Sequence, residues 1–196
     1  MTPVAGLVLA AGVGRRYGGP KALARTGGVP WVVRAVDVLR DAAADPVLVV
    51  VGAAADEVRA LLPAGTTAVD NPDWRSGMGS SLRAGLTAAA ALPVDAAVVL
   101  LVDLPGVTAA MVRTLTAGAA RDTLRQAEFD GRPGHPVLIG RDHWAAAAAA
   151  AHGDVGARAY LRTHGAARVP LGSAADGADV DVAAPPDDRA SGGGPH

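Results

Sequence analysis

The segment VAGLVLAAGVGRRYGGPK (residues 4–21) decides the expected fold. Residues 4–10 form a short, continuously apolar run, and a stretch rich in glycine and basic residues follows it directly. An apolar run of this length without polar alternation is typical of a strand buried on both faces of a sheet. The segment therefore predicts a buried first strand whose carboxyl end opens into a glycine-rich loop.

Strands and helices are expected to alternate after this first strand. Pro30 suits the first turn of a helix, and apolar residues then recur at helical spacing up to Leu39. The pattern further predicts strands at residues 46–51, 66–69 and 96–102, and helices at residues 56–62, at residues 80–92 and from Thr108 onward. Such alternation predicts an α/β fold with three layers and a mostly parallel sheet.

The pattern changes from Asp122 onward. Two extended runs, LRQAEF and HPVLIG, flank DGRPG and predict a small hairpin excursion. Helices are expected at residues 141–151 and 154–164, and a last extended piece at residues 179–182. The composition of PPDDRASGGGPH predicts a disordered tail at residues 185–196, so we expect one domain over residues 1–184.

Composition excludes several classes of function. The chain has 196 residues, half of them apolar, which suits one domain with a sizeable core. A net charge of −1 gives no footprint for extended nucleic acid, and the absence of cysteine excludes disulfides and thiolate chemistry. The first apolar run is too short to span a membrane, which takes about 20 residues, and its arginines follow it instead of preceding it. These features predict a cytoplasmic protein.

The glycine-rich loop has the chemistry of a phosphate site. Gly12 and Gly14 would let main-chain N–H groups approach phosphate oxygens, and Arg15, Arg16 and Lys21 would offset the charge of a polyphosphate. Ligands bind beyond the carboxyl ends of strands in open α/β sheets, which is where this loop follows its strand. Lys21 is the only lysine among 18 basic residues, which suggests a position that needs a compact ammonium group.

Three other interpretations of the loop explain the sequence less well. A dinucleotide-binding turn would need a third glycine where Tyr17 stands, and an acidic residue after the second strand. A Walker A loop would need serine or threonine after the lysine, where Ala22 stands. A plain surface turn does not explain why three cations gather at the end of a strand.

LAAGVGRRYGGPK (residues 9–21) resembles the signature LxAGxGxRxGxxK of the MobA-like nucleotidyltransferases. The resemblance extends over residues 4–182 and implies a Rossmann-like nucleotidyltransferase domain that binds a nucleoside triphosphate. The residues that it implies as nucleotide contacts in this loop are Leu9, Ala10, Ala11, Gly12, Gly14, Arg15, Arg16 and Lys21.

A second segment, NPDWRSGMGSSLRAG (residues 71–85), resembles the molybdenum cofactor cytidylyltransferase branch of this family. It adds Asn71 and Gly77 to the implied nucleotide contacts. Ser80 and Ser81 lie at an expected helix start, whose N–H groups suit an anion or a base edge, although the serines would also suit a simple cap. Arg75 is a further candidate phosphate contact.

VLLVDLPGV (residues 99–107) places Asp103 at the end of the expected central strand. A carboxylate there suits Mg²⁺, which takes one or two protein carboxylates together with substrate oxygens. An Asp-Leu-Pro step could also simply end a strand, but the resemblance implies that Asp103 holds the metal. Asp181 matches the second aspartate of a D[IV]DTPxD element that can complete such a site, although the threonine-proline step is absent here.

Two further segments resemble the acceptor side of the cytidylyltransferase branch. GRPGHPVLIG (residues 131–140) contains a GHP triplet that implies an acceptor contact for His135, although a packing corner would also suit this residue. HGDVGARAYL (residues 152–161) resembles a GDxGAR segment and implies acceptor-side roles for Asp154 and Arg158.

The resemblance thus implies a Mg²⁺-dependent transfer of CMP from CTP to the terminal phosphate of molybdopterin or its molybdenum form. Lys21, Arg16 and Asp103 would carry the catalysis. The alternatives are a relative that uses GTP or another phosphorylated acceptor, a non-catalytic chaperone that inserts cofactor into a molybdenum hydroxylase, and an NAD-dependent oxidoreductase.

Overall fold

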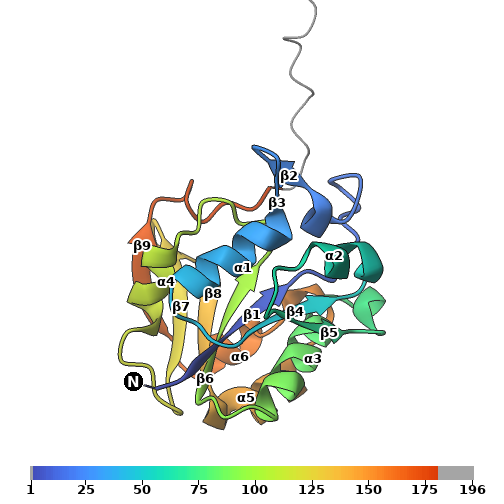
Figure 1. Cartoon of the computed structure of the whole chain (residues 1–196). Coiled ribbons are helices and arrows are strands. Elements are labelled where there is room, and N and C mark those ends of the chain that lie inside the picture. Colours follow the sequence, from blue (N-terminus) through green and yellow to red (C-terminus); the bar gives the residue numbers. More distant parts are fainter. Residues whose placement is uncertain (1, 181–196) are drawn as a thin grey trace, which may run out of the picture.

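The computed structural model describes residues 2–180 of the chain and contains a seven-stranded sheet in the order β5-β4-β1-β6-β8-β7-β9 (Figure 1). β1 pairs in parallel with β4 and β6, and β4 pairs in parallel with β5. β8 runs antiparallel to β6 and β7, and β9 is parallel to β7. The expected α/β fold with a mostly parallel sheet is confirmed.

The strands are β1 (Val4–Leu9), β4 (Val47–Val51), β5 (Thr67–Asp70), β6 (Ala96–Leu101), β7 (Leu124–Phe129), β8 (Arg132–Gly140) and β9 (Ala167–Gly172), with a separate small pair β2 (Arg25–Thr26) and β3 (Val29–Pro30). The helices are α1 (Trp31–Asp41), α2 (Ala55–Leu61), α3 (Met78–Ala90), α4 (Ala109–Thr116), α5 (Trp144–Ala150) and α6 (Arg158–Thr163). Four single turns, η1 (Lys21–Leu23), η2 (Trp74–Ser76), η3 (Arg141–His143) and η4 (Gly153–Val155), lie between them.

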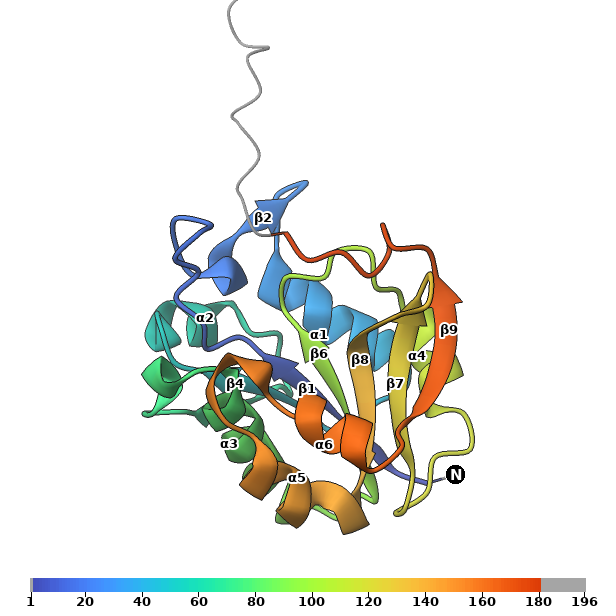
Figure 2. The ribbon, with the colours of Figure 1, turned by 180° about the vertical axis from the view of Figure 1, so that it is seen from behind.

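Helices cover both faces of the sheet, as three layers require. On one face, α1, α2 and α4 bury Leu39, Val58 and Leu115 against the strands. On the other face, α3, α5 and α6 bury residues such as Leu86 and Trp144 (Figure 2). The central strands are apolar on both faces because both faces are covered.

The carboxyl half differs in detail from the prediction. The hairpin formed by β7 and β8 is confirmed, but it belongs to the main sheet, since β8 pairs directly with β6. The helix expected at residues 154–164 is interrupted at Gly156, whose φ of 51° is not helical, and only α6 remains. β9 was not predicted because Pro170 interrupts its short alternation of Ala167, Val169 and Leu171, and a proline within a run argues against a strand. Its Pro170 is tolerated because β9 is an edge strand.

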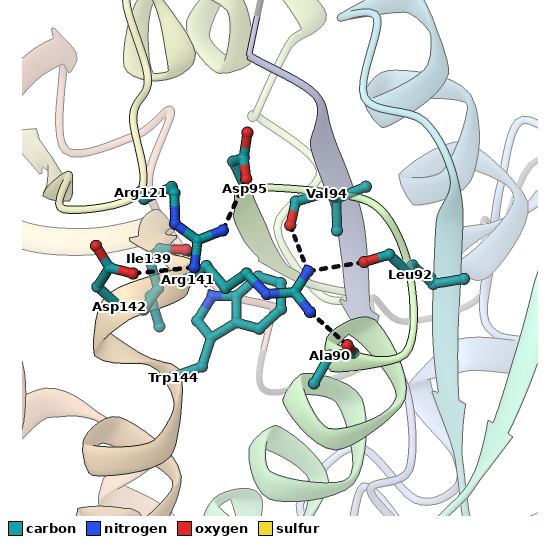
Figure 3. Close-up of polar contacts among 9 residues, drawn as sticks. All are labelled: Ala90, Leu92, Val94, Asp95, Arg121, Ile139, Arg141, Asp142 and Trp144. Carbon is teal, nitrogen blue, oxygen red and sulfur yellow. Dashed lines mark hydrogen bonds and ion pairs between the residues drawn. The ribbon is translucent and has the colours of Figure 1, made fainter.

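At the end of the sheet where β6 begins, arginines bond the chain between α3 and β6 (Figure 3). Arg141 donates to the carbonyls of Ala90, Leu92 and Val94 at 2.5–2.7 Å. Ala90 is the last residue of α3, where helix geometry leaves carbonyls without partners in the helix, and Leu92 and Val94 lie in the segment that follows. Arg121 bridges Asp95 and Asp142 beside them. This end of the sheet is closed by hydrogen bonds within the chain.

Two predicted features lie outside the described residues. The tail expected at residues 185–196 is one. The other is the second half of the extended piece expected at residues 179–182, whose first two residues form no strand.

Candidate nucleotide and acceptor site

Lys21 and Asp103 meet at the carboxyl ends of β1 and β6. The last residues of these parallel strands, Leu9 and Leu101, are register partners, so the segments that follow them emerge side by side. The Lys21 Nζ atom lies 2.8 Å from Asp103 Oδ2, and the two side chains are only 14% and 16% exposed. The predicted juxtaposition of the glycine-rich loop and the end of the central strand is confirmed.

Gly14 forms the centre of the glycine-rich loop. Its carbonyl accepts hydrogen bonds from the N–H groups of Tyr17, Gly18 and Gly19 at 2.9–3.2 Å. Its φ is +62°, and a Cβ atom here would lie 1.9 Å from the Gly19 carbonyl oxygen, so only glycine fits. The turn therefore uses three N–H groups of the loop within the chain.

Other N–H groups of the loop remain available to a ligand. Within residues 2–180, the N–H groups of Gly12, Val13 and Arg15 make no main-chain hydrogen bond. The side chains of Arg15 and Arg16 are exposed beside them, whereas Ala10 and Ala11 are buried and support the loop from below. The loop therefore presents main-chain donors and cationic side chains on its first half.

Aromatic contacts hold the second half of the loop in place. The rings of Tyr17 and Trp31 lie 5.3 Å apart, and Trp31 opens α1 and donates to the Thr26 hydroxyl. Ala22, next to Lys21, is buried in the core. These contacts fix the main chain from which Lys21 extends toward Asp103.

Asp103 has the free acceptor capacity that a cation needs. Its Oδ2 atom accepts from Lys21, while its Oδ1 atom accepts no hydrogen bond from residues 2–180. No group of three or more His, Cys, Asp or Glu side chains gathers around a metal position in this part of the chain. Asp181 lies outside the described residues. The chain nevertheless approaches Asp103 just before it, since the Val180 N–H donates to the Asp103 carbonyl at 3.1 Å.

Asn71, Ser80 and Ser81 form a buried hydrogen-bonded network beside the loop. The Asn71 side-chain amide donates to both serine hydroxyls at 2.9 and 3.1 Å, and all three residues are at most 5% exposed. The Asn71 side-chain oxygen accepts from the Asp73 N–H. The structure thus brings these residues together in a network that fixes the start of α3, and their contact with a nucleotide stays a prediction.

Gly77 sits where α3 begins and touches the acceptor-side segment. A Cβ atom here would lie 2.5 Å from the Gly153 main chain and 2.8 Å from a side-chain oxygen of Asp154. Gly77 also has a φ of +104°, so both the close approach and the backbone conformation favour glycine here. Arg75 lies over the Trp74 ring at 4.3 Å, away from the Asn71 network.

His135, Asp154 and Arg158 line one cavity of about 270 Å³, on the sheet face covered by α3 and α6. Leu9, Leu101 and Leu104 contribute to its wall, so it begins beside the residues that flank Asp103. The structure therefore brings all three predicted acceptor residues together. Asp154 and Arg158 are exposed at their turns, and His135 is partly buried.

Burial and the neighbouring Arg158 charge lower the pKa of His135 to about 4. Both causes disfavour the protonated ring. His135 is therefore neutral at physiological pH and offers one donor and one acceptor nitrogen to the cavity.

The sequence analysis missed several residues of this cavity. Gln126, Met78 and Asp179 also line it. Gln126 could have been found, because in LRQAEF it shares the inward phase of Leu124 on a predicted strand. Asp179 could not, because only the folded path of residues 173–180 brings it to the hairpin.

Comparison with protein families assigns the chain to a family whose domain covers most of its length. Residues 6–169 match the MobA-like NTP transferase domain. The chain belongs to this family. The family is named for nucleotidyl transfer, and the match covers the glycine-rich loop and most of the residues that line the cavity.

Two relatives of this chain are named for different activities. A nicotine blue oxidoreductase of Paenarthrobacter nicotinovorans is 38% identical over 169 residues, which cover 81% of each chain. A molybdenum cofactor guanylyltransferase of Rhodobacter capsulatus is 33% identical over 146 residues, which cover 74% of this chain and 67% of the relative. The family framework is therefore shared by proteins named for different reactions.

Solved structures with the same fold include two mycobacterial proteins. A homologue of Mycobacterium tuberculosis Rv0371c from Mycobacterium sp. strain JC1 superposes with a TM-score of 0.75 at 31% identity, covering 91% of this chain and 90% of the other. The manganese complex of Rv0371c from M. tuberculosis H37Rv superposes with a TM-score of 0.69 at 26% identity, covering 88% and 90%. A divalent ion is thus present in one structural relative.

Within residues 2–180, no helix is both long and apolar enough to cross a membrane.

Proposed function

We propose that this protein transfers CMP from CTP to the terminal phosphate of molybdopterin or its molybdenum form, with release of pyrophosphate. The observation that carries the proposal is the 2.8 Å contact between Lys21 and Asp103 at the carboxyl ends of β1 and β6. It sets an ammonium group and a carboxylate at the edge of a glycine-rich loop and beside a cavity suited to a small molecule.

The reaction needs no nucleophile from the protein. A phosphate oxygen of the acceptor attacks the α-phosphorus of the nucleotide, and pyrophosphate leaves on the opposite side. Catalysis then consists of alignment and charge stabilisation. Lys21 and Arg16 stabilise the charge on the α-phosphate and on pyrophosphate, while the N–H groups of Gly12, Val13 and Arg15 bind the phosphate chain.

Asp103 would hold Mg²⁺, with Asp181 as a proposed second ligand. The Oδ1 atom of Asp103 supports this assignment because it takes no hydrogen bond within residues 2–180. When bound, the ion would neutralise charge on the phosphate oxygens of the nucleotide. Lys21, in contact with the same carboxylate, holds its position at the carboxyl ends of β1 and β6.

The cavity lined by His135, Asp154 and Arg158 would receive the acceptor. Arg158 suits an anionic group of the acceptor because a guanidinium group donates two parallel hydrogen bonds to oxyanions. The LAAG start of the loop and the GHP triplet favour cytidylyl transfer. The relative named as a guanylyltransferase supports GTP as the alternative nucleotide.

A panel of nucleotides and acceptors tests the proposal. Pyrophosphate release is measured with CTP, GTP, ATP and UTP in the presence of Mg²⁺ and molybdopterin, and the product is identified by mass spectrometry. We expect release with CTP and a product that carries CMP. Release with GTP alone would select the guanylyl alternative. CTP binding without any release would favour a non-catalytic insertion chaperone.

A second candidate function is oxidoreduction of a small molecule at the same cavity. It is favoured by the 38% identity to the nicotine blue oxidoreductase. The structure gives a dinucleotide little room near the end of β4, because a Cβ atom on Gly52 would lie 2.6 Å from the Trp74 side chain. Titration with NADH and NADPH, followed by their absorbance, tests this candidate. Binding of either cofactor together with oxidation by an added acceptor would establish it.

A further inference from the structure

Gln126 is a polar residue in an otherwise apolar row of the sheet. Its register partner on β8 is Val137, which pairs with Val99 on β6. The row continues to Leu7 on β1 and Leu48 on β4, and all four of these residues are buried in the core covered by α3, α5 and α6. Gln126 is the only glutamine in the chain, and it stands where core packing calls for an apolar side chain.

The side-chain amide of Gln126 has no partner within the described part of the chain. Gln126 is 7% exposed, yet its amide makes no hydrogen bond to a side chain or to the main chain among residues 2–180. Fully buried side-chain polar atoms in this part of the protein all have partners, so the amide reaches open space only through the cavity that it lines. An amide that has no partner in the described protein and faces a cavity is available to a ligand there, which makes its presence in an apolar row informative.

The remainder of the cavity combines an apolar floor with polar and charged side chains around it. Its floor consists of leucine and valine side chains, including Leu9, Val99 and Val137. Its volume of about 270 Å³ is near the lower end for small-molecule sites, which are about 300–1,000 Å³. Among the described residues that line the cavity, Gln126 and His135 are the polar ones on strands, and Asp154, Arg158 and Asp179 lie on the segments around them. A ligand seated here meets an apolar surface and a few convergent hydrogen-bonding groups.

We propose that Gln126 is the residue that selects the acceptor ring, by hydrogen-bonding a ring edge on which a donor and an acceptor stand side by side. A primary amide presents an N–H donor and a carbonyl acceptor in one plane, so it matches a cyclic amide in a planar heterocycle. The inference rests on the proposed function in one respect, namely that this cavity receives the acceptor. The phosphate of the acceptor then extends past Leu101 toward Asp103.

The proposal gives selectivity a physical basis. A ring without the amide edge would leave the Gln126 amide unsatisfied after water has been displaced from the cavity, and such mismatches are rejected strongly. An apolar residue at position 126 would remove this penalty and with it the discrimination. Arg168, the register partner of Gln126 on β9, is exposed and does not line the cavity, so it offers a matched control on the neighbouring strand.

The test is calorimetric titration of the full chain with two probes, pterin and quinoxaline. Both are bicyclic and flat, but only pterin has a cyclic amide edge. We expect the wild-type protein and Arg168→Leu to bind pterin at least ~10-fold more tightly than quinoxaline. We expect Gln126→Leu to bind pterin roughly 10–100-fold more weakly and to lose the preference.

Two controls keep the result interpretable. The thermal midpoint of Gln126→Leu should equal or exceed that of the wild type, because a buried unpaired amide is replaced by an apolar group of similar size. Unchanged discrimination in Gln126→Leu, or no binding of pterin by the wild type, would overturn the proposal. Pyrophosphate release measured on the same wild-type sample reports separately on the proposed function, so the two failures are distinguishable.

Discussion

The two ends of the central strands use similar side chains for opposite purposes. At the carboxyl ends of β1 and β6, Lys21 meets Asp103 beside exposed arginines and loop N–H groups that the described chain does not consume. At the opposite end, Arg141 donates hydrogen bonds to three carbonyls at and beyond the end of α3, and Arg121 forms ion pairs with two aspartates (Figure 3). One end leaves hydrogen-bonding capacity for a ligand, and the other uses it within the fold.

Function and stability therefore depend on side chains at opposite ends of the sheet. Cations that bind carbonyls at and beyond the end of a helix stabilise the fold, because the last carbonyls of a helix have no partner within it and carry the negative end of the helix dipole. Cations held at a glycine-rich loop stabilise charge on a bound phosphate. Substitutions at the two ends should therefore change different measurements.

The largest effect is expected for Lys21→Ala. We expect kcat for pyrophosphate release to fall by roughly 10²–10³-fold, because a positioned charge at the reacting phosphates is lost. The thermal midpoint should change far less than kcat, because Lys21 belongs to neither of the apolar core clusters that cover the sheet. Lys21→Arg keeps the charge but not the compact ammonium, and it should retain only part of the activity. Full activity in Lys21→Ala would break the distinction between the two ends.

Arg141→Ala should have the complementary effect. Loss of three charged hydrogen bonds to the carbonyls after α3 should lower the free energy of unfolding by about 2–3 kcal/mol. Chemical denaturation measures this loss. The kcat of the folded variant should match the wild type because Arg141 lies at the far end of β6. A large fall in kcat with unchanged stability would show that the ends are coupled.

His135 makes stability depend on pH. Its folded pKa of about 4 is below the ordinary value of 6.5, so the unfolded chain binds a proton that the folded chain excludes between these values. Stability should therefore fall as pH drops from about 6.5 toward 4, by roughly 3 kcal/mol. His135→Leu should lack this component. Denaturation curves of both proteins at roughly pH 4, 5, 6 and 7, on either side of the ordinary histidine pKa, measure this loss of stability. Parallel pH profiles would contradict the burial of a neutral ring.

Arg121→Ala should have the smallest effect. Its ion pairs with Asp95 and Asp142 raise the pKa of the guanidinium, but the side chain is 52% exposed. Exposed pairs contribute little because solvent screens them. We expect both the thermal midpoint and kcat to stay within measurement error of the wild type. A marked loss of stability would show that the network around Asp95 acts as a unit.

Much of the architecture follows from local sequence. The strands that became β1, β4 and β6 were predicted because residues buried on both faces leave an uninterrupted apolar run. β9 and the interruption of the helix before α6 were not predicted. The first depends on pairing with β7 at an exposed edge, and the second on a backbone turn at Gly156 that an alanine-rich sequence does not reveal.

The site was predicted unevenly for the same reason. Lys21 and Asp103 were paired correctly because parallel strands place their carboxyl ends together. The use of three loop N–H groups by the Gly14 carbonyl was not foreseen, since it depends on the turn that the loop adopts. Gln126 was missed because its significance comes from the four apolar residues beside it in the sheet. The nucleotide and metal roles of the predicted residues remain predictions.

Titration of a non-hydrolysable CTP analogue, with and without Mg²⁺, tests whether the glycine-rich loop and Asp103 act together on a triphosphate. The wild-type protein and Asp103→Asn are compared under identical conditions. We expect Mg²⁺ to tighten binding by about tenfold or more in the wild type, because the ion joins the carboxylate to the phosphates. Asp103→Asn should lose this gain. Equal affinity in all four titrations, or no binding of the analogue by the wild type, would contradict the proposed site.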